Sequence, residues 1–443
     1  MLHFGTDGVR GVAIDELTPE MARDLARAVA RVLHPTAVVI GRDTRESGPV
    51  LEHAIIDGCA AEGVPVHLLG VAPTPAIAFA AERHGWVAIA ITASHNPWTD
   101  NGIKVFASGG AKLADAEQLE IERVWHAFVA EPAPVALGTV HDSHEVLEEY
   151  FDHRVNVVGQ SLNGLRIVVD CANGAMSSIA PSVLEAAGAT VIVMNDAPDG
   201  RNINVACGAT SPERLTQRVV ADGADAGIAF DGDGDRLIAV TATGQLVDGD
   251  HIMAIAAHDL AQRGLLRNKG VAVTVMTNLG FHRAMETAGV DVVVTPVGDR
   301  SVLMALEEYD FVLGGEQSGH IIHRAHATTG DGLLAALILL EYVCRTRTSL
   351  DEAMTIMQTY PQVLMNVRTN ERVADPAHEL ADVILAAEES LAGNGRILVR
   401  SSGTEPLVRV MVEAATEAEA TSVAQHLVDV LIERHGGSQE GKH

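Results

Sequence analysis

A serine follows an apolar run in the first quarter of the chain, in a setting that could carry a chemical group. The run from Trp86 to Ile91 predicts a buried strand, and Ser94-His95-Asn96-Pro97 comes shortly after it. Pro97 cannot donate to a sheet ladder and disfavours the helical conformation at the residue before it, so the serine stands on a stiff turn. With Lys104 ten residues downstream, this hydroxyl could accept a group and pass it on. An ordinary strand-to-loop turn, in which these residue types are common, is the alternative.

A second apolar strand, Gly227 to Phe230, runs directly into Asp231-Gly232-Asp233-Gly234-Asp235-Arg236. Three carboxylates are too costly to bury without partners, and the glycines let the backbone turn tightly enough for them to converge. Oxygen ligands without His or Cys favour Mg²⁺ over Zn²⁺. An EF-hand loop begins similarly, but Arg236 and Ala242 occupy its glycine and final glutamate positions. A divalent metal site is therefore predicted, with a solvated acidic turn as the alternative.

Two further strands open into polar, glycine-rich segments. Val312-Leu313 leads into Gly314-Gly315-Glu316-Gln317-Ser318-Gly319-His320, whose side chains suit the hydroxyl groups of a sugar. Ile397-Leu398-Val399 leads into Arg400-Ser401-Ser402-Gly403-Thr404-Glu405-Pro406, and Arg409 follows. Guanidinium groups, hydroxyls and free amides around a glycine favour an anion, and a phosphate in particular. The alternatives are a glycine-rich hairpin for the first segment and a surface Arg–Glu pair for the second.

Taken in order, these segments resemble the α-D-phosphohexomutase superfamily, and in particular its bacterial branch that acts on glucosamine phosphates. The resemblance covers nearly the whole chain. The superfamily motifs are FGTDGVRG (4–11), TASHNP (92–97), FDGDGDR (230–236), GGEQSGH (314–320) and RSSGTEPLVRV (400–410). The narrower match is carried by VDCANGA (169–175), GRNINVACGAT (200–210), TPVGDRSV (295–302) and TTGDG (328–332).

The resemblance implies an isomerase that interconverts glucosamine 6-phosphate and α-D-glucosamine 1-phosphate and feeds the synthesis of UDP-N-acetylglucosamine and cell-wall precursors. Ser94 would be a phosphoserine, and glucosamine or glucose 1,6-bisphosphate would be the intermediate or activator. A kinase or autophosphorylation would install the first phosphate. A phosphomannomutase or phosphoglucomutase shares this machinery, a Mg²⁺-dependent phosphosugar phosphatase is a less favoured reading, and a non-enzymatic sugar-phosphate sensor is disfavoured.

The resemblance also implies roles for individual residues. One Mg²⁺ per chain would be held by the phosphoserine and the acidic loop: Ser94, Asp231, Asp233 and Asp235. The other catalytic candidates are Lys104, Arg236, Arg10 and His95; the first two could assist proton transfer or neutralise phosphate oxygens, and His95 would orient the serine or act structurally. The substrate-binding candidates are Glu316, Ser318 and His320 for the sugar, and Arg400, Ser402, Gly403, Thr404 and Arg409 for the phosphate.

The composition limits the partners of this chain. A formal net charge of −28 over 443 residues argues against nucleic acid and against an anionic membrane surface. It does not exclude a phosphorylated substrate, because at physiological salt the Debye length is about 8 Å and local charge dominates. Four scattered cysteines without CxxC spacing, with no visible signal peptide, predict a reduced, cytoplasmic protein. The oligomeric state, including a homodimer, is left open.

Strand-like and helix-like segments alternate along the chain and predict an α/β fold. Together with the resemblance, they imply three related α/β domains and a smaller C-terminal α+β domain around a central cleft. The predicted boundaries are 1–142 for the phosphoserine loop, 143–248 for the metal loop, 249–359 for the sugar loop and 360–443 for the phosphate loop. The polar segment 436–443 is predicted to be disordered.

Overall fold

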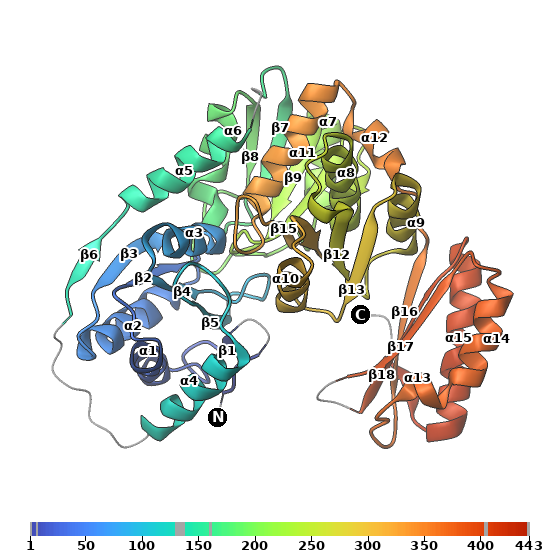
Figure 1. The fold of residues 1–443 in the computed structure, drawn as a ribbon, viewed down its shortest axis with the longest axis horizontal. Coiled ribbons are helices and arrows are strands. Elements are labelled where there is room, and N and C mark those ends of the chain that lie inside the picture. The colour runs from blue at the N-terminus through green and yellow to red at the C-terminus, as the bar shows by residue number, and fades with distance from the viewer. Residues whose placement is uncertain (1, 6–7, 129–137, 159–161, 403–405, 441–443) are drawn as a thin grey trace. The chain divides into compact units, whose positions relative to one another are not determined.

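The computed structural model describes residues 2–5, 8–128, 138–158, 162–402 and 406–440. The chain divides into two compact units, one made of residues 1–276 and 288–356 and the other of residues 277–287 and 357–443. The described residues form four β-sheets, three in the first unit and one in the second (Figure 1). Among them, no helix is long and apolar enough to cross a membrane.

The three sheets of the first unit share one strand order. In each sheet, two consecutive strands are parallel neighbours, and the next strand along the chain lies parallel on the other side of the first of them. The strand after that pairs antiparallel with this third strand. Written from the antiparallel strand, the three orders are β5-β4-β2-β3, β10-β9-β7-β8 and β15-β14-β12-β13. The serine, aspartate and glutamate segments each connect the third parallel strand to its antiparallel partner. The three α/β domains are therefore related in topology, and each contributes the same connection to the site.

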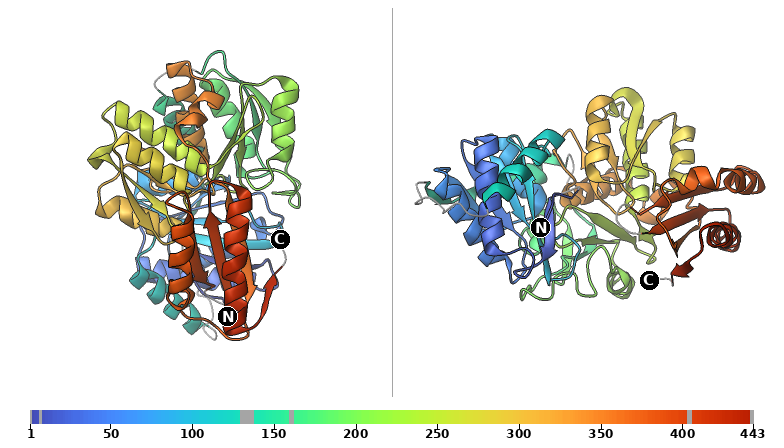
Figure 2. Two further views of the ribbon diagram at one scale, coloured as in Figure 1. Left: turned by 90° about the vertical axis from the view of Figure 1, so that its right-hand side faces the viewer. Right: turned by 90° about the horizontal axis from the view of Figure 1, so that it is seen from below.

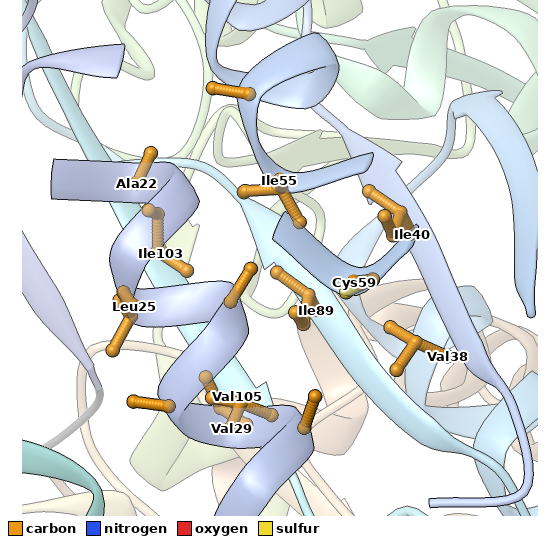
Figure 3. Close-up of a cluster of buried hydrophobic side chains, with 14 of the residues drawn as sticks. Ala22, Leu25, Val29, Val38, Ile40, Ile55, Cys59, Ile89, Ile103 and Val105 are labelled. Atoms are coloured by element: carbon orange, nitrogen blue, oxygen red, sulfur yellow. The ribbon is translucent and has the colours of Figure 1, made fainter. Parts of the chain in front are cut away.

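The first sheet extends this order to β1-β5-β4-β2-β3-β6. Its strands are β1 (Val9–Val12), β2 (Val38–Arg42), β3 (Val66–Val71), β4 (Val87–Ile91), β5 (Asp100–Phe106) and β6 (Val140–Asp142). Its helices are α1 (Pro19–Leu33), α2 (Gly48–Ala61), α3 (Thr74–His84), α4 (Asp115–Ala127) and α5 (Glu145–Val157). Helices α1, α2 and α4 share one apolar cluster with the sheet, where Leu25, Ile55 and Ile89 lie close together (Figure 3). Helix α3 and the start of α5 belong to a second cluster with other residues of this sheet.

The second and third sheets are smaller. The second has the strands β7 (Arg166–Asp170), β8 (Thr190–Met194), β9 (Ala226–Phe230), β10 (Leu237–Thr241) and β11 (Leu246–Val247), with η2 (Ala175–Ser178), α6 (Ala180–Ala186) and α7 (Glu213–Asp222). The third has β12 (Gly270–Thr274), β13 (Asp291–Thr295), β14 (Leu313–Gly315) and β15 (Ile321–His323). The helices of this third part are α8 (Gly249–Gln262), η3 (Arg267–Lys269), α10 (Asp299–Glu308), α11 (Gly332–Thr346), α12 (Leu350–Ala353) and η4 (Met354–Ile356).

The second unit is built on an antiparallel sheet in the order β17-β18-β16-β19. Its strands are β16 (Gln362–Arg368), β17 (Arg396–Ser401), β18 (Leu407–Glu413) and β19 (Ser438–Glu440). Its helices are α13 (Pro376–Glu379), α14 (Ala381–Ser390) and α15 (Glu417–His435), and most of α9 (Leu279–Ala288) also belongs to it. Alternate residues of β16, namely Val363, Met365 and Val367, pack with helices α14 and α15 on one side of the sheet (Figure 2).

Side-chain caps fix the starts of two helices, and the C-terminal segment differs from its prediction. Thr18 caps α1 by accepting a hydrogen bond from the Met21 amide, and Ser349 and Glu352 form a reciprocal capping box. The predicted disorder of 436–443 is wrong as far as Glu440; residues 441–443 lie outside the described residues. Gly436 and Gly437 turn the chain at positive φ, and β19 then pairs with the edge of β16. A polar strand is stable there because an edge strand needs only backbone partners on one side.

Candidate active site

Ser94 lies at the carboxyl end of β4 in a strained, buried conformation. Its φ of 53° is in the left-handed region, which is uncommon for a residue with a side chain. The Ser94 amide donates to the Thr92 hydroxyl at 2.9 Å, and the Ser94 hydroxyl donates to Asp231 Oδ2 at 2.6 Å. The turn therefore directs the serine oxygen from the first domain to the acidic loop of the second, and the role of Ser94 as a group carrier stays a prediction.

Arg45, which the sequence did not mark as a site residue, holds the serine turn through hydrogen bonds to its backbone. Its buried guanidinium donates to the backbone carbonyl oxygens of Ser94, Asn96 and Asp100 at 2.9 Å each, and also to that of Pro97. Its Nε donates to Asp43 Oδ2 at 2.8 Å. This geometry matches the planar fork of arginine donors, which can serve several acceptors at once.

A register argument could have found Arg45. Residues 43–45 follow β2, and β2 pairs in parallel with β4 so that Arg42 lies beside Ile91. Asp43 therefore comes level with Thr92, whose hydroxyl donates to Asp43 Oδ2 at 2.7 Å. The local sequence does not reveal the strand pairing that brings these residues together.

The three aspartates of the acidic loop converge as predicted. All three are buried, and one carboxylate oxygen of each lies within 4.8 Å of the others. Burial, together with the charges of Asp235 and Asp233, raises the pKa of Asp231 well above its ordinary value. Burial and Asp235 act in the same direction on Asp233, but Lys104 and the Thr74 hydroxyl outweigh them and lower the pKa of Asp233. The cluster is therefore an anionic site, and nearby cations would stabilise its carboxylates.

Lys104, on β5, supplies part of that charge. Its Nζ donates to Asp233 Oδ2 and to Asp235 Oδ2, both at 2.9 Å. Burial alone would lower the pKa of Lys104, but the two aspartates raise it above its ordinary value. The other oxygens, Asp233 Oδ1 and Asp235 Oδ1, are buried without a hydrogen-bond partner among the described residues. Unsatisfied carboxylate oxygens in an oxygen-only donor set fit a hard divalent cation such as Mg²⁺.

The remaining catalytic candidates surround the serine and the aspartates. The Arg236 amide donates to Asp231 Oδ1 at 3.2 Å, and Arg236 Nε lies 3.8 Å from Asp235 Oδ1. His95 Nδ1 is 3.3 Å from the Ser94 hydroxyl. Burial, followed by the charges of Arg236 and Arg10, lowers the pKa of His95 to about 4. His95 is thus neutral at neutral pH, and Arg10, on β1, contributes positive charge to the same site.

The sugar-loop candidates occupy different environments. Glu316 is partly exposed and its Oε1 accepts from the Gly298 amide at 3.0 Å, while Ser318 is exposed. His320 is buried: its Nε2 accepts from the Gly330 amide at 3.2 Å, and its Nδ1 lies 3.7 Å from Asp235 Oδ1. The structure thus brings His320 to the aspartates, whereas contacts of all three residues with a sugar stay a prediction.

Several residues outside the predicted set support these loops. Thr74, at the start of α3, donates its hydroxyl to Asp233 Oδ2 at 2.7 Å. The Asn204 side chain donates to the Ser94 carbonyl at 2.9 Å, and the Gly332 amide donates to the Gly234 carbonyl at 3.0 Å. A Cβ at Gly174 would lie 2.3 Å from the Gly232 carbonyl oxygen, so only glycine allows this approach. The motifs around 169–175, 200–210 and 328–332 therefore act by packing on the serine and metal loops.

The phosphate-loop candidates lie in the second unit. Arg400 on β17 is directly opposite Arg409 on β18, and Asn366 on β16 is the next residue across the sheet. Burial, and then the charge of Arg409, lowers the pKa of Arg400. Ser402 follows β17 and its amide donates to the Leu407 carbonyl at 2.7 Å. Two adjacent guanidinium groups are typical of an anion site. Gly403 and Thr404 lie outside the described residues.

Comparisons with known proteins agree with this architecture. The four phosphoglucomutase/phosphomannomutase domain families match in order: α/β/α domain I over residues 1–128, domain II over 148–244, domain III over 248–360 and the C-terminal domain over 364–430. A phosphoglucomutase/phosphomannomutase family protein from Burkholderia thailandensis superposes with a TM-score of 0.81 at 25% identity, covering 98% of both chains. An N-acetylphosphoglucosamine mutase from Aspergillus fumigatus, in complex with GlcNAc-6P and magnesium, has a TM-score of 0.66 at 18% identity and covers 98% of this chain and 96% of its own.

The sequence relatives are closer. The phosphoglucosamine mutases of Frankia casuarinae and Thermobifida fusca are 50% and 48% identical to this chain, and each alignment covers 97% of both proteins. Both alignments therefore span all four domains, including the segments that carry the loops described above. This chain belongs to the phosphoglucosamine mutase family, a branch of the phosphoglucomutase/phosphomannomutase proteins.

Proposed function

We propose that this protein interconverts D-glucosamine 6-phosphate and α-D-glucosamine 1-phosphate through a phosphoserine at Ser94 and a bound 1,6-bisphosphate. The observation that carries this proposal is the 2.6 Å hydrogen bond from the Ser94 hydroxyl to Asp231, within a buried, oxygen-only acidic cluster. A serine at this point can exchange a phosphoryl group beside a cation that offsets its charge. The 48–50% identity to phosphoglucosamine mutases supports the amino sugar as substrate.

In the first half-reaction, the phosphoryl group leaves Ser94 Oγ and bonds to the free hydroxyl of the sugar phosphate. The sugar hydroxyl loses its proton and Ser94 Oγ regains one, which gives the 1,6-bisphosphate. The intermediate then turns over, and its other phosphoryl group returns to Ser94 Oγ with the same exchange of protons. Each half-reaction therefore needs a proton acceptor for the sugar hydroxyl and a proton donor for Ser94 Oγ, and one residue near the serine can serve as both.

Lys104 is our candidate for that group, with Arg236 neutralising phosphate oxygens. Asp233 and Asp235 raise the pKa of Lys104, which in this arrangement favours its protonated, proton-donating form. One Mg²⁺, bound by the triad and the phosphoserine, would neutralise charge on the transferring group. Neutralising the same two aspartates would also bring the pKa of Lys104 down towards a value that permits exchange.

The remaining assignments extend this proposal. Arg400, Ser402, Gly403, Thr404 and Arg409 would hold the non-reacting phosphate, Glu316, Ser318 and His320 the sugar, and Arg10 and His95 would orient the reacting groups. Glucosamine or glucose 1,6-bisphosphate would serve as activator, and a kinase or autophosphorylation would phosphorylate Ser94. The domain boundaries after residues 142, 248 and 359 also remain our proposal, as do a cytoplasmic location and a contribution to UDP-N-acetylglucosamine synthesis.

A coupled assay with glucosamine 1-phosphate and glucose 1-phosphate tests the substrate. We expect kcat/KM to favour the amino sugar at least about tenfold, the effect of roughly 1.4 kcal/mol of differential binding. Equal rates would move the assignment to a phosphoglucomutase. Release of inorganic phosphate at the rate of isomerisation would instead identify a phosphatase.

A further inference from the structure

A second group of possible metal ligands shares no residue with the site above. His3 lies in the segment before β1, while Glu122 and His126 are one turn apart on α4. One nitrogen or carboxylate oxygen of each residue lies within 4.8 Å of those of the other two. Two imidazoles and one carboxylate form a donor set that Zn²⁺ accepts in proteins and Mg²⁺ does not favour.

One contact of this His3–Glu122–His126 cluster resembles the outer shell of a metal site, and another joins two of its three side chains directly. His3 Nδ1 contacts Glu122 Oε1, and the Phe4 amide donates to Glu122 Oε2 at 3.4 Å. His126 Nε2 lies 3.2 Å from the Leu2 carbonyl oxygen. An imidazole has two nitrogens, and metal-bound histidines usually bind the ion with one while the other donates to a carbonyl or carboxylate.

The separation of the two rings gives an independent check. Two imidazoles bound to one tetrahedral Zn²⁺, with Zn–N bonds of about 2.0–2.1 Å, have ring centroids about 5 Å apart. The centroids of His3 and His126 are 5.4 Å apart and their planes are perpendicular. The separation of the two rings is therefore compatible with one shared ion. The His3 side chain is 66% exposed, which leaves room for a water molecule in the fourth position.

We propose that His3, Glu122 and His126 bind one divalent transition-metal ion of the zinc class. The ion would tie residues 2–4 to helix α4. This segment leads into β1, which carries Arg10 and pairs with β5, the strand of Lys104. Bound metal would thus stabilise the edge of the first sheet next to the serine site, without taking part in the reaction.

The test uses the full-length chain, stripped of metal and then saturated with Mg²⁺ so that the aspartate triad is occupied. Titration with Co²⁺ should give the strong visible bands of a four-coordinate ion with nitrogen ligands, and Zn²⁺ should abolish them with a stoichiometry of one per chain. Zn²⁺ should also raise the melting temperature, since a ligand that binds only the folded state stabilises it.

The double variant His3→Ala/His126→Ala should lose both the Co²⁺ bands and the Zn²⁺-dependent rise in melting temperature. The matched control is His53→Ala, because His53 is 78% exposed and pairs with Asp57 one turn along its helix, but belongs to no three-ligand cluster among the described residues. Glu122→Gln, which keeps both imidazoles, should weaken Zn²⁺ binding, and circular dichroism should show native helix content in every variant.

Two outcomes would overturn the proposal. If the double variant and the His53→Ala control take up equal amounts of Zn²⁺, the ion binds elsewhere on the chain. If the wild-type protein takes up no Zn²⁺ in the presence of Mg²⁺, the cluster is only a hydrogen-bonded ion pair.

Discussion

The Ser94 region and the Arg400 region deal with charge in opposite ways. Around Ser94, buried carboxylates are met by Lys104 at 2.9 Å and by Arg236, so opposite charges are already paired without a ligand. On the sheet of the second unit, Arg400 and Arg409 are direct cross-strand neighbours, and no acidic side chain among the described residues pairs with either.

This difference indicates how each region responds to its ligand. The serine region is held in place by its own hydrogen bonds, so we expect its geometry to persist when metal and substrate are absent. The arginine pair is a site of like charges, which costs stability until an anion arrives. In our proposal one region performs the chemistry and the other captures a phosphate, and the following predictions separate the two.

The largest effect is expected at the aspartate triad. Asp233→Asn removes a carboxylate that binds Lys104 and, in our proposal, Mg²⁺; kcat should fall at least about a hundredfold, because metal-assisted charge stabilisation provides several kcal/mol. The variant should also bind Mn²⁺ more weakly by calorimetry. Asp142→Asn, at a side chain that is 73% exposed, is the control and should retain full activity. Full activity of Asp233→Asn in excess chelator would contradict the metal site.

Arg45→Lys should have the next largest effect. Lysine keeps the charge beside Asp43 but lacks the planar fork that serves all four carbonyl oxygens of the serine turn, so Ser94 should lose its alignment. We expect kcat to fall about a hundredfold, the cost of misplacing a reacting atom by about 1 Å, with little change in KM. Arg27→Lys is the matched control, since Arg27, on α1, is also fully buried but pairs with Glu62 directly after α2. An equal loss of activity in both variants would reduce Arg45 to a general structural role.

Arg409→Met should raise KM more than it lowers kcat. One charge-assisted hydrogen bond contributes about 1.5–3 kcal/mol, which corresponds to a KM increase of about 10- to 150-fold. Because Arg409 repels Arg400, the variant should be as stable as wild type without phosphate, and it should lose the stabilisation that added phosphate gives. Arg368→Met, on neighbouring β16 and already paired with Glu440, should leave KM unchanged. A wild-type KM for Arg409→Met would remove the arginine pair from the substrate site.

Glu316→Gln should produce the smallest and most specific effect. A sugar ammonium group would lose a charged acceptor, so kcat/KM for glucosamine 1-phosphate should fall about tenfold more than that for glucose 1-phosphate. Parallel steady-state kinetics with the two sugars measure this ratio. Equal losses for the two sugars would show that Glu316 contacts a hydroxyl common to both.

The sequence predicted the residues that come together around Ser94 better than it predicted the residues that support them. Ser94 and the aspartates were recognisable because their turn and glycine spacing are local. Arg45, Thr74 and Asn204 were missed because they reach the site through strand register and contacts between domains. The relation between the three α/β domains was expected only from the family resemblance, because domains can share a strand order without sharing a side-chain pattern. Strand β19 was missed because its three residues are polar and carry no strand pattern. They form a strand only because the rest of the sheet places the edge of β16 beside them.

The transfer of a phosphoryl group from Ser94 to the sugar is the claim that most needs a direct test. Enzyme labelled with ³²P-phosphate should carry the label on Ser94 and, in a single turnover with unlabelled glucosamine 6-phosphate, should pass it to the sugar bisphosphate. Ser94→Ala should carry no label and show no turnover, while Ser108→Ala, whose hydroxyl bonds the Gly85 carbonyl, should behave as wild type. Label that stays on the protein through a full turnover, or isomerase activity in Ser94→Ala, would contradict the account.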